Sequence, residues 1–374
     1  MALEVLLLEP WYGGSHRAWA DGLVRHSRHH VTLLTLPGRH WRWRLRGAAL
    51  TLADAVDAHV AIHGRPDVVV VSGMVDLAAL RGFARDALGS VPVALYLHEN
   101  QVVYPEGPAR QAGDPAGWTT WSSMAAADLV LLASAHHRDA LLAALGPFLA
   151  RAPDHGHERH LTRVSGRCEV LPVGVELDAL LAGARRGCEV TGLPPLVVWN
   201  QRWDEDRRPE RLLRILGHLA DEGVPFRVAL AGPRTRPLPP ELGTAVDRLG
   251  DRVVHLGWCE PDAYRALLLR SDVVASVTRH EYFGVGVVEA VAAGAVPLLP
   301  ARLSYPEVLP VEAHTRCLYA ARPAERLRSL LVGIEEIRSD PAVAGVRAAM
   351  SRWGWPEVAP RYDDRLELLA VTGR

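Results

Sequence analysis

Two glutamates, Glu281 and Glu289, stand with seven residues between them in a stretch whose pattern predicts a ligand site. Residues 272–277 predict a short buried parallel strand, and the small residues after Phe283 predict a helix. The intervening loop then lies at the carboxyl edge of a sheet, beside a helix N-terminus that favours negative charge. Backbone N–H groups can bind phosphate there, and carboxylates can accept hydrogen bonds from sugar hydroxyls. The stretch predicts a nucleotide-sugar site; on this motif alone, a surface glutamate followed by a helix glutamate is the alternative.

Two arginines, Arg202 and Arg207, bracket the loop after a predicted strand at residues 196–200. A pair of guanidinium groups can hold a diphosphate and neutralise the charge that grows on it as it leaves. The competing interpretation is that they pair with the acidic residues 204–206 on a wet surface. Their position at the end of a strand favours the diphosphate.

The first predicted strand, residues 3–8, leads into a loop that contains Gly13 and Gly14, and a helix is expected from about Arg17. Ser15 can cap that helix, and the glycine pair lets backbone approach a ligand closely. In a Rossmann-like domain this first loop meets a diphosphate or an acceptor. The loop lacks the G-x-G-x-x-G pattern, so a dinucleotide fingerprint is not supported, and a plain strand-to-helix turn is the alternative.

Four polar residues, His-Glu-Asn-Gln at 98–101, directly follow a predicted strand at residues 91–97. His98 is the best candidate for a hydrogen bond to the transferred sugar or to the reacting hydroxyl. A lone histidine at a strand end is more often structural, but Glu99, Asn100 and Gln101 accompany this one.

A cationic and aromatic segment spans residues 39–46, where four arginines surround two tryptophans. Guanidinium groups bind phosphates and indole rings stack on bases, so the segment suits a nucleic acid. The alternative, of nearly equal weight, is the entry of an amphipathic helix whose tryptophans pack on the core.

The composition is that of a globular protein, with 374 residues, 49% hydrophobic and 23% charged. No window approaches the ~20 apolar residues of a membrane span, and the first residues lack the basic region of a secretory signal, so we expect a cytoplasmic protein. The four cysteines form no C-x-x-C pair, and the spacing of His155, His157 and His160 fits no zinc motif. No metal is therefore expected. All 42 basic residues are arginine, which indicates a GC-rich coding bias and a bacterial source.

Strands and helices alternate along the chain, which predicts an α/β fold with two Rossmann-like domains. We expect an N-terminal acceptor domain over residues 1–182, a linker near 182–195, and a donor domain over residues 194–352. Residues 353–374 are expected to form a C-terminal helix that packs back toward the first domain.

Several motifs occur together in order, and their sum resembles the tRNA-queuosine α-mannosyltransferase family. The stretch with the paired glutamates is itself similar to the motif of retaining glycosyltransferases with the GT-B architecture, in which two Rossmann-like domains face each other across a cleft. The match runs from residue 3 to about residue 310. The segments that carry it are Glu-Pro-Trp-Tyr-Gly-Gly-Ser-His at 9–16, His-Trp-Arg-Trp-Arg at 40–44, Leu-His-Glu-Asn-Gln at 97–101 with Tyr104-Pro105, Pro-Asp-His at 153–155, Gln-Arg-Trp-Asp-Glu-Asp-Arg at 201–207, His-Glu-Tyr-Phe-Gly-Val at 280–285 and Tyr-Pro-Glu at 305–307.

This resemblance implies transfer of mannose from GDP-mannose to the cyclopentene hydroxyl of queuosine at the wobble position of tRNA-Asp, with retention and without a metal or other cofactor. It implies that Glu281 lies near the sugar, that Glu289 holds the ribose, and that Arg202 and Arg207 bind the diphosphate. Such enzymes usually have lysine where this chain has Arg207, so the reach of this group differs. The implied catalytic residues are Glu281, His98 and Arg202; the donor site adds Gly13, Gly14, Arg207, Phe283, Gly284, Val285 and Glu289; the acceptor site comprises Ser15, His16, Arg42, Trp43, Arg44, Glu99, Asn100 and Gln101.

Two other functions stay open at this point. A GT-B enzyme could use another nucleotide-sugar on a small molecule, a lipid or a polysaccharide, although we find no convincing membrane-facing amphipathic helix. A non-catalytic module that binds a nucleotide-sugar or tRNA could use the same fold, because fold alone does not establish activity.

Overall fold

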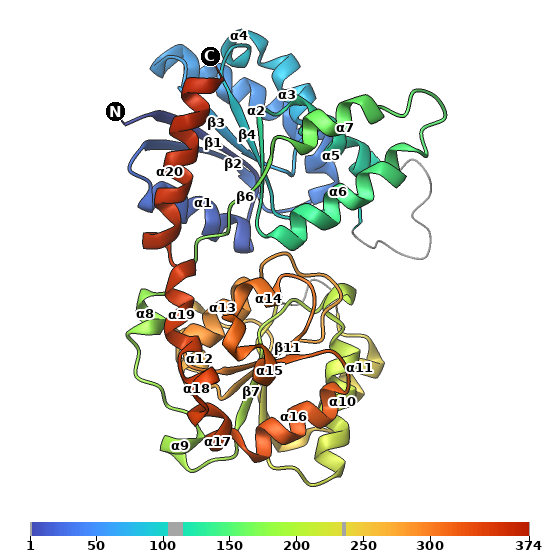
Figure 1. Ribbon diagram of the computed structural model, residues 1–374, viewed down its shortest axis with the longest axis vertical. Helices are drawn as coiled ribbons and strands as arrows, with labels where there is room; N and C mark the ends of the chain where they lie inside the picture. The colour runs from blue at the N-terminus through green and yellow to red at the C-terminus, as the bar shows by residue number, and fades with distance from the viewer. Residues whose placement is uncertain (1, 104–114, 234–236, 374) are drawn as a thin grey trace. The chain divides into compact units, whose positions relative to one another are not determined.

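The chain forms two compact units, each built on a six-stranded parallel sheet. The computed structural model describes residues 2–103, 115–233 and 237–373 (Figure 1). Unit 1 comprises Met1–Val175 and Trp355–Arg374, and unit 2 comprises Glu176–Gly354. Tyr104-Pro105, one of the motif segments, lies outside the described residues.

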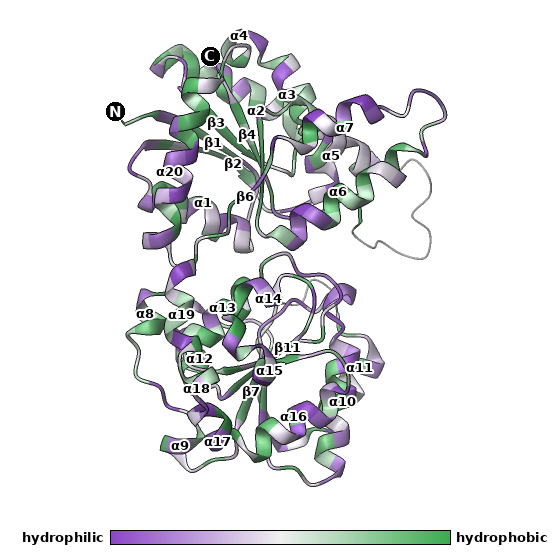
Figure 2. Ribbon diagram, in the orientation of Figure 1, coloured by the Kyte–Doolittle hydropathy of each residue, from purple (hydrophilic) through white to green (hydrophobic). Residues whose placement is uncertain are grey.

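The sheet of unit 1 has the strand order β2-β1-β3-β4-β5-β6, and all its pairs are parallel. Its central strands are apolar on both faces because helices cover both faces (Figure 2). The strands are β1 Glu4–Tyr12, β2 His30–Pro37, β3 Val68–Ser72, β4 Val93–Leu97, β5 Leu129–Leu132 and β6 Cys168–Val170. The helices are α1 Gly14–His26, α2 Trp41–His63, α3 Leu77–Phe83, α4 Arg85–Leu88, α5 Pro115–Ala126, α6 Ala135–Leu149 and α7 Glu158–Ser165.

The last helix, α20 (Trp355–Thr372), belongs to unit 1 and runs beside α1 (Figure 1). Trp19 Nε1 donates a hydrogen bond to Tyr362 Oη at 3.0 Å, and Tyr362 in turn donates to the carbonyl of Pro172. A Cβ on Gly22 would lie 2.1 Å from Trp355 Nε1, so this glycine gives the indole its space. The end of the chain thus completes the core of the unit that the start of the chain begins.

The sheet of unit 2 has the order β12-β11-β10-β7-β8-β9. Its strands are β7 Leu196–Trp199, β8 Arg227–Leu230, β9 Val253–Leu256, β10 Val273–Ala275, β11 Val296–Pro300 and β12 Leu318–Tyr319. Its helices are α8 Asp178–Leu181, α9 Cys188–Thr191, α10 Pro209–Asp221, α11 Pro240–Asp247, α12 Pro261–Arg270, α13 Val285–Ala292, α14 Tyr305–Val308, α15 His314–Cys317, α16 Pro323–Val332, α17 Ile334–Ser339, α18 Pro341–Ala344 and α19 Val346–Ala349, with 3₁₀ turns at Glu205–Arg207, Gly250–Arg252, Val311–Ala313 and Met350–Trp353. Among the described residues, no helix is long and apolar enough to cross a bilayer.

The chain passes from unit 1 to unit 2 after Val175, earlier than the predicted boundary at residue 182. The reason is a set of long-range hydrogen bonds that sequence patterns do not reveal. Arg347 donates to the carbonyl oxygens of Leu180, Leu181 and Gly183. The predicted linker is also bound to unit 2, because Arg185 donates to the carbonyls of Ser271 and Gly294. These bonds make residues 176–194 part of the second unit.

Two local predictions in unit 1 were wrong. Helix α1 begins at Gly14 with Gly13 as its N-cap, so Ser15 lies inside the helix and does not cap it. The sequence pattern predicts a helix over residues 48–62, but helix α2 already begins at Trp41, and His40 precedes it in a left-handed conformation. In both cases the helix follows the strand almost directly. Residues that we expected before each helix form its first turn.

Candidate active site

In unit 2, Arg207 and Glu281 form a largely buried ion pair at the carboxyl edge of the sheet. Arg207 Nη1 donates to Glu281 Oε2 at 2.5 Å and to the carbonyl of His280 at 2.9 Å. Its Nε lies 3.2 Å from Asp206 Oδ2. Burial alone would lower the pKa of Arg207, but Glu281 and Asp206 raise it above its usual value, so the guanidinium stays charged. The pair brings together two residues that the sequence placed on separate loops.

The loop that carries Glu281 is arranged around the start of α13. Glu281 Oε1 accepts hydrogen bonds from the backbone N–H groups of Tyr282 and Phe283. Gly284 is the N-cap of α13 with φ of 95°, a left-handed conformation that glycine adopts without strain. The first N–H groups of a helix have no partner within the helix, so those that begin at Val285 can receive an anion.

Phe283 contributes backbone to this loop, whereas its ring is buried. The ring is 5% exposed and meets Trp353 edge-on, with centroids 5.3 Å apart. Its predicted donor-site role is therefore confined to the main chain.

Glu289 lies in the second turn of α13 and is held by Tyr264. Tyr264 Oη donates to Glu289 Oε2 at 2.8 Å, and Asn200 Nδ2 donates to Tyr264 Oη at 2.8 Å. Burial raises the pKa of Glu289 to about 7, and the hydrogen bond from Tyr264 acts in the opposite direction. Neither Tyr264 nor the role of Asn200 was foreseen, because Tyr264 sits in an ordinary helical pattern without any distinguishing local signal.

Arg202 is the most accessible of the predicted phosphate ligands. Its side chain is 41% exposed, and its Nε lies 3.4 Å from Asp204 Oδ2. Exposed ion pairs of this kind contribute little free energy, so this pair by itself does not keep the guanidinium from a ligand. The surface pairing that we considered as an alternative is thus present, but it does not exclude ligand binding.

In unit 1, Glu9 organises a buried polar cluster at the carboxyl end of β1. Its side chain is fully buried and accepts hydrogen bonds from the Trp11 N–H and from Ser72 Oγ, both at 2.9 Å. His16 Nδ1 lies 3.3 Å from both of its carboxylate oxygens. The sequence shows Glu9 as an acidic residue directly after an apolar strand. This position could have indicated a functional role, but we assigned none to Glu9.

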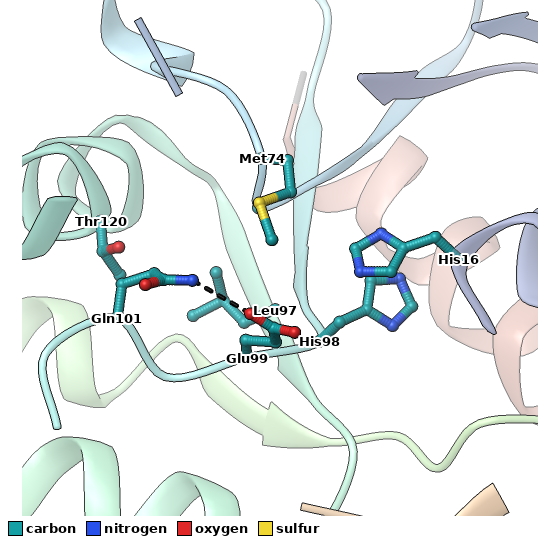
Figure 3. Close-up of a pocket in the computed structure, with 8 residues that line it drawn as sticks. His16, Met74, Leu97, His98, Glu99, Gln101 and Thr120 are labelled. Carbon is teal, nitrogen blue, oxygen red and sulfur yellow. Dashed lines mark hydrogen bonds between the residues drawn. The ribbon is translucent and has the colours of Figure 1, made fainter. Parts of the chain in front are cut away.

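The ring of His98 lies against that of His16, with centroids 4.1 Å apart and planes tilted by 40° (Figure 3). Burial lowers the pKa of His98 well below its usual value, and His16 and His137 lower it further, so its imidazole is neutral. Its Nε2 is buried and has no hydrogen-bond partner in the described part of the chain. The structure therefore brings His98 together with His16, as a shared site requires.

A small pocket opens beside these two histidines (Figure 3). Gln101 Nε2 donates to Glu99 Oε2 at 3.1 Å across this pocket. Asn100 does not line it: its Oδ1 accepts from the backbone N–H groups of Val102 and Val103, which fixes the turn after β4. The residues that line the pocket are His16, Gly73, Met74, Leu97, His98, Glu99, Gln101 and Thr120.

Glu9, His16 and His98 place donor atoms within 4.8 Å of one another, and glutamate and histidine are common zinc ligands. Two features oppose a metal centre. Glu9 already accepts hydrogen bonds from the Trp11 N–H and from Ser72 Oγ, and His16 Nδ1 lies 3.3 Å from the same carboxylate. The geometry favours a hydrogen-bonded pair in which Glu9 orients the ring of His16.

The first loop and the cationic segment are accessible in unit 1. Gly14, with φ of 52°, and Ser15 are exposed in the first turn of α1. Trp43 is 64% exposed in the first turn of α2, and Arg42 beside it is exposed as well. The segment is a helix entry, as one alternative stated, but Trp43 does not pack into the core.

Solved structures that share this fold include two synthases. The starch synthase IV catalytic domain from Arabidopsis thaliana, bound to ADP and acarbose, matches with a TM-score of 0.70, 13% identity and coverage of 99% of this chain and 100% of that one. Sucrose-phosphate synthase from Thermosynechococcus elongatus matches with a TM-score of 0.69, 18% identity and coverage of 99% and 100%. Two parallel Rossmann-like sheets and these structural neighbours define the chain as a protein of the GT-B fold.

Proteins of similar sequence identify the family to which the chain belongs. Residues 4–175 match the model of the tRNA-queuosine alpha-mannosyltransferase N-terminal family. A tRNA-queuosine alpha-mannosyltransferase from Drosophila melanogaster is 32% identical over 315 residues, which are 83% of this chain and 82% of that protein. The chain belongs to the tRNA-queuosine alpha-mannosyltransferase family.

Proposed function

We propose that this enzyme transfers mannose from GDP-mannose to the cyclopentene hydroxyl of queuosine at the wobble position of tRNA-Asp, with retention at the anomeric carbon. The observation that supports a nucleotide-sugar donor is the arrangement in unit 2. There Arg207, on the loop after β7, pairs with Glu281 on the loop after β10, and that second loop leads through Gly284 into α13, which carries the Tyr264-held Glu289. Family membership supports the tRNA acceptor and the mannosyl group.

In this proposal the chemistry is driven by stabilising the departing diphosphate. Arg202, Arg207 and the first N–H groups of α13 supply positive charge without a metal ion. Arg207 is already held by Glu281 and the His280 carbonyl, so it provides a preorganised charge, whereas Arg202 contributes a more exposed guanidinium. Glu281 faces the sugar, and Glu289 binds the ribose.

In unit 1, the neutral His98 is suited to a hydrogen bond with the sugar or the attacking hydroxyl, because its buried Nε2 has no partner in the described part of the chain. His16, oriented by Glu9, lies beside it together with Glu99 and Gln101. The exposed arginines and Trp43 at the start of α2 are suited to the phosphates and unpaired bases of an anticodon arm.

The decisive test is incubation of the purified protein with queuosine-containing tRNA and a panel of nucleotide-sugars, followed by mass spectrometry of the nucleosides. We expect a hexose on queuosine from GDP-mannose alone. Addition from another donor would replace the mannose assignment, and modification of a tRNA without queuosine would replace the acceptor. Hydrolysis of no donor and transfer to no tRNA would identify a binding module instead of an enzyme.

A further inference from the structure

Three side chains from three elements meet in one directed hydrogen-bond chain in unit 2. Asn200 follows β7, Tyr264 lies on α12, and Glu289 lies on α13, which contacts α12 (Figure 1). Asn200 Nδ2 donates to the Gly286 carbonyl at 2.7 Å and to Tyr264 Oη at 2.8 Å. Tyr264 Oη then donates to Glu289 Oε2 at 2.8 Å. Every hydrogen in the chain is committed, so each group has one orientation.

Acceptors outnumber donors in this chain. Asn200 Oδ1 is buried and has no hydrogen-bond partner among the described residues. Glu289 uses Oε2 for Tyr264, and Oε1 of this partly exposed residue accepts no hydrogen bond in the same part of the protein, so solvent or a ligand can reach it. A buried acceptor without a donor destabilises the fold, and a network with a purely structural role would satisfy it. The unpartnered amide oxygen of Asn200 and the accessible carboxylate oxygen of Glu289 are therefore two acceptors that a ligand with hydrogen-bond donors can use.

Close packing fixes the spacing between these acceptors. A Cβ on Gly286 would lie 3.0 Å from Asn200 Nδ2 and 3.2 Å from its Cγ. The first turn of α13 can approach the amide this closely because residue 286 is glycine. The same turn leads directly to Glu289, so the amide and the carboxylate are held against one helix.

We propose that Tyr264 is a positioning residue for Glu289 and that Asn200 Oδ1 is a second acceptor, so that the two residues together receive the two hydroxyl groups of a nucleotide ribose. This rests on the proposed function in one respect, the contact between Glu289 and the donor's ribose. It adds the residue that orients the carboxylate and the group that binds the second hydroxyl. A vicinal diol supplies two donors at a fixed spacing, which matches two acceptors of fixed orientation.

The test compares the affinities of GDP, 2′-deoxy-GDP and 3′-deoxy-GDP for the wild type and for Tyr264→Phe, measured by calorimetry. The substitution keeps the ring and removes only the hydroxyl. We expect GDP to bind about tenfold more weakly to the variant, because the carboxylate loses its fixed orientation. The deoxynucleotide that lacks the hydroxyl bound by Glu289 should show a much smaller loss of affinity. It makes no hydrogen bond to Glu289, so the orientation of that carboxylate does not affect its binding. Equal losses for all three nucleotides would overturn the positioning role.

A matched control is Tyr319→Phe, which removes a buried hydroxyl of the same unit that donates to the Ser276 carbonyl. It should leave the three affinities in their wild-type ratios. If it changes them as Tyr264→Phe does, the effect is a general loss of packing and the proposal fails.

Asn200→Ala and Glu289→Ala test which of the two acceptors binds which hydroxyl of the ribose. The wild type should bind GDP more tightly than either deoxynucleotide. We expect each variant to lose this difference for one deoxynucleotide, and the two variants to lose it for different ones. If Asn200→Ala weakens all three nucleotides equally, its oxygen faces another part of the ligand and this half of the proposal is wrong. Should Asn200→Ala not fold, Asn200→Ser removes the amide oxygen but keeps one hydrogen-bond donor, and it is expected to lose the same deoxynucleotide preference.

Different results would overturn the proposed donor arrangement and the positioning role of Tyr264. An unchanged affinity in Glu289→Ala would remove the ribose from this site and with it the proposed donor arrangement. A large loss in Glu289→Ala with none in Tyr264→Phe would leave that arrangement intact and overturn only the present inference. Because every nucleotide has a ribose, UDP and ADP with their deoxy forms repeat the test if GDP does not bind.

Discussion

Arg207 Nη1 donates to Glu281 Oε2 at 2.5 Å, and both side chains are largely buried, with exposed fractions of 16% and 13%. The guanidinium is further held by the His280 carbonyl and by Asp206. The loop after β7 and the loop after β10 are therefore joined by one charge network. A lysine at position 207 could supply the charge but could not reach several acceptors at once, because it lacks the planar fork.

Glu281→Ala is expected to destabilise the protein by about 3 kcal/mol, because it removes one partner of a buried ion pair and leaves the other buried. The double variant Arg207→Met with Glu281→Ala should lose less than the sum of the losses in Glu281→Ala and Arg207→Met. Urea unfolding of the four proteins measures this coupling. Additive losses would show that the two side chains do not stabilise one another.

Arg202→Ala should slow transfer about 100-fold, which corresponds to about 3 kcal/mol of barrier, with little change in stability. The physical reason is that its exposed ion pair with Asp204 contributes little to folding, whereas a charge-assisted contact to a leaving diphosphate acts in the transition state. Arg248→Ala, which breaks another exposed ion pair of unit 2, is the control for loss of charge. Wild-type transfer by a folded Arg202→Ala enzyme would place the diphosphate elsewhere.

Affinity for GDP-mannose should rise as the pH increases through about 7 and then level off. Burial raises the pKa of Glu289 to about 7, so the carboxyl is protonated below that pH and ionised above it. The ionised form accepts the stronger hydrogen bond from a hydroxyl. GDP-mannose is the better probe than GDP, because a terminal phosphate itself titrates near pH ~6. Glu289→Gln should abolish the pH dependence, and a variant that keeps it would assign the titration to another group.

Replacement of Arg42, Arg44 and Arg46 by alanine should weaken tRNA binding and flatten its salt dependence. Each lost phosphate contact lowers the slope of log affinity against log salt by about one unit. Affinity for the nucleotide-sugar should stay the same. Titrations at several salt concentrations beside a melting curve separate this result from a structural role, in which the melting temperature falls and the slope is retained. In that case His98–Gln101 and residues 118–121 become the next candidates for the acceptor site.

The sequence by itself determined the alternation of apolar strands and helices, the parallel sheets and the loops at their carboxyl edges. These features follow from local periodicity and from the rule that parallel strands end at one edge. That is why Arg202, Arg207, Glu281 and His98 could be named before any coordinates. The paired glutamates and the ordered motifs were likewise enough to indicate the family.

Only the tertiary structure decided which of these side chains meet. Arg207 and Glu281 are 74 residues apart in the sequence, yet they form a hydrogen bond. Trp19 donates a hydrogen bond to Tyr362, which is 343 residues away in the sequence. Tyr264 acquires its place beside Glu289 from the packing of α12 on α13, which no local pattern encodes. The buried environment that shifts the pKa of Glu289 and of His98 likewise depends on distant elements. Periodicity assigns a residue to an element and a face, whereas hydrogen bonds and burial depend on what the rest of the fold brings against that face.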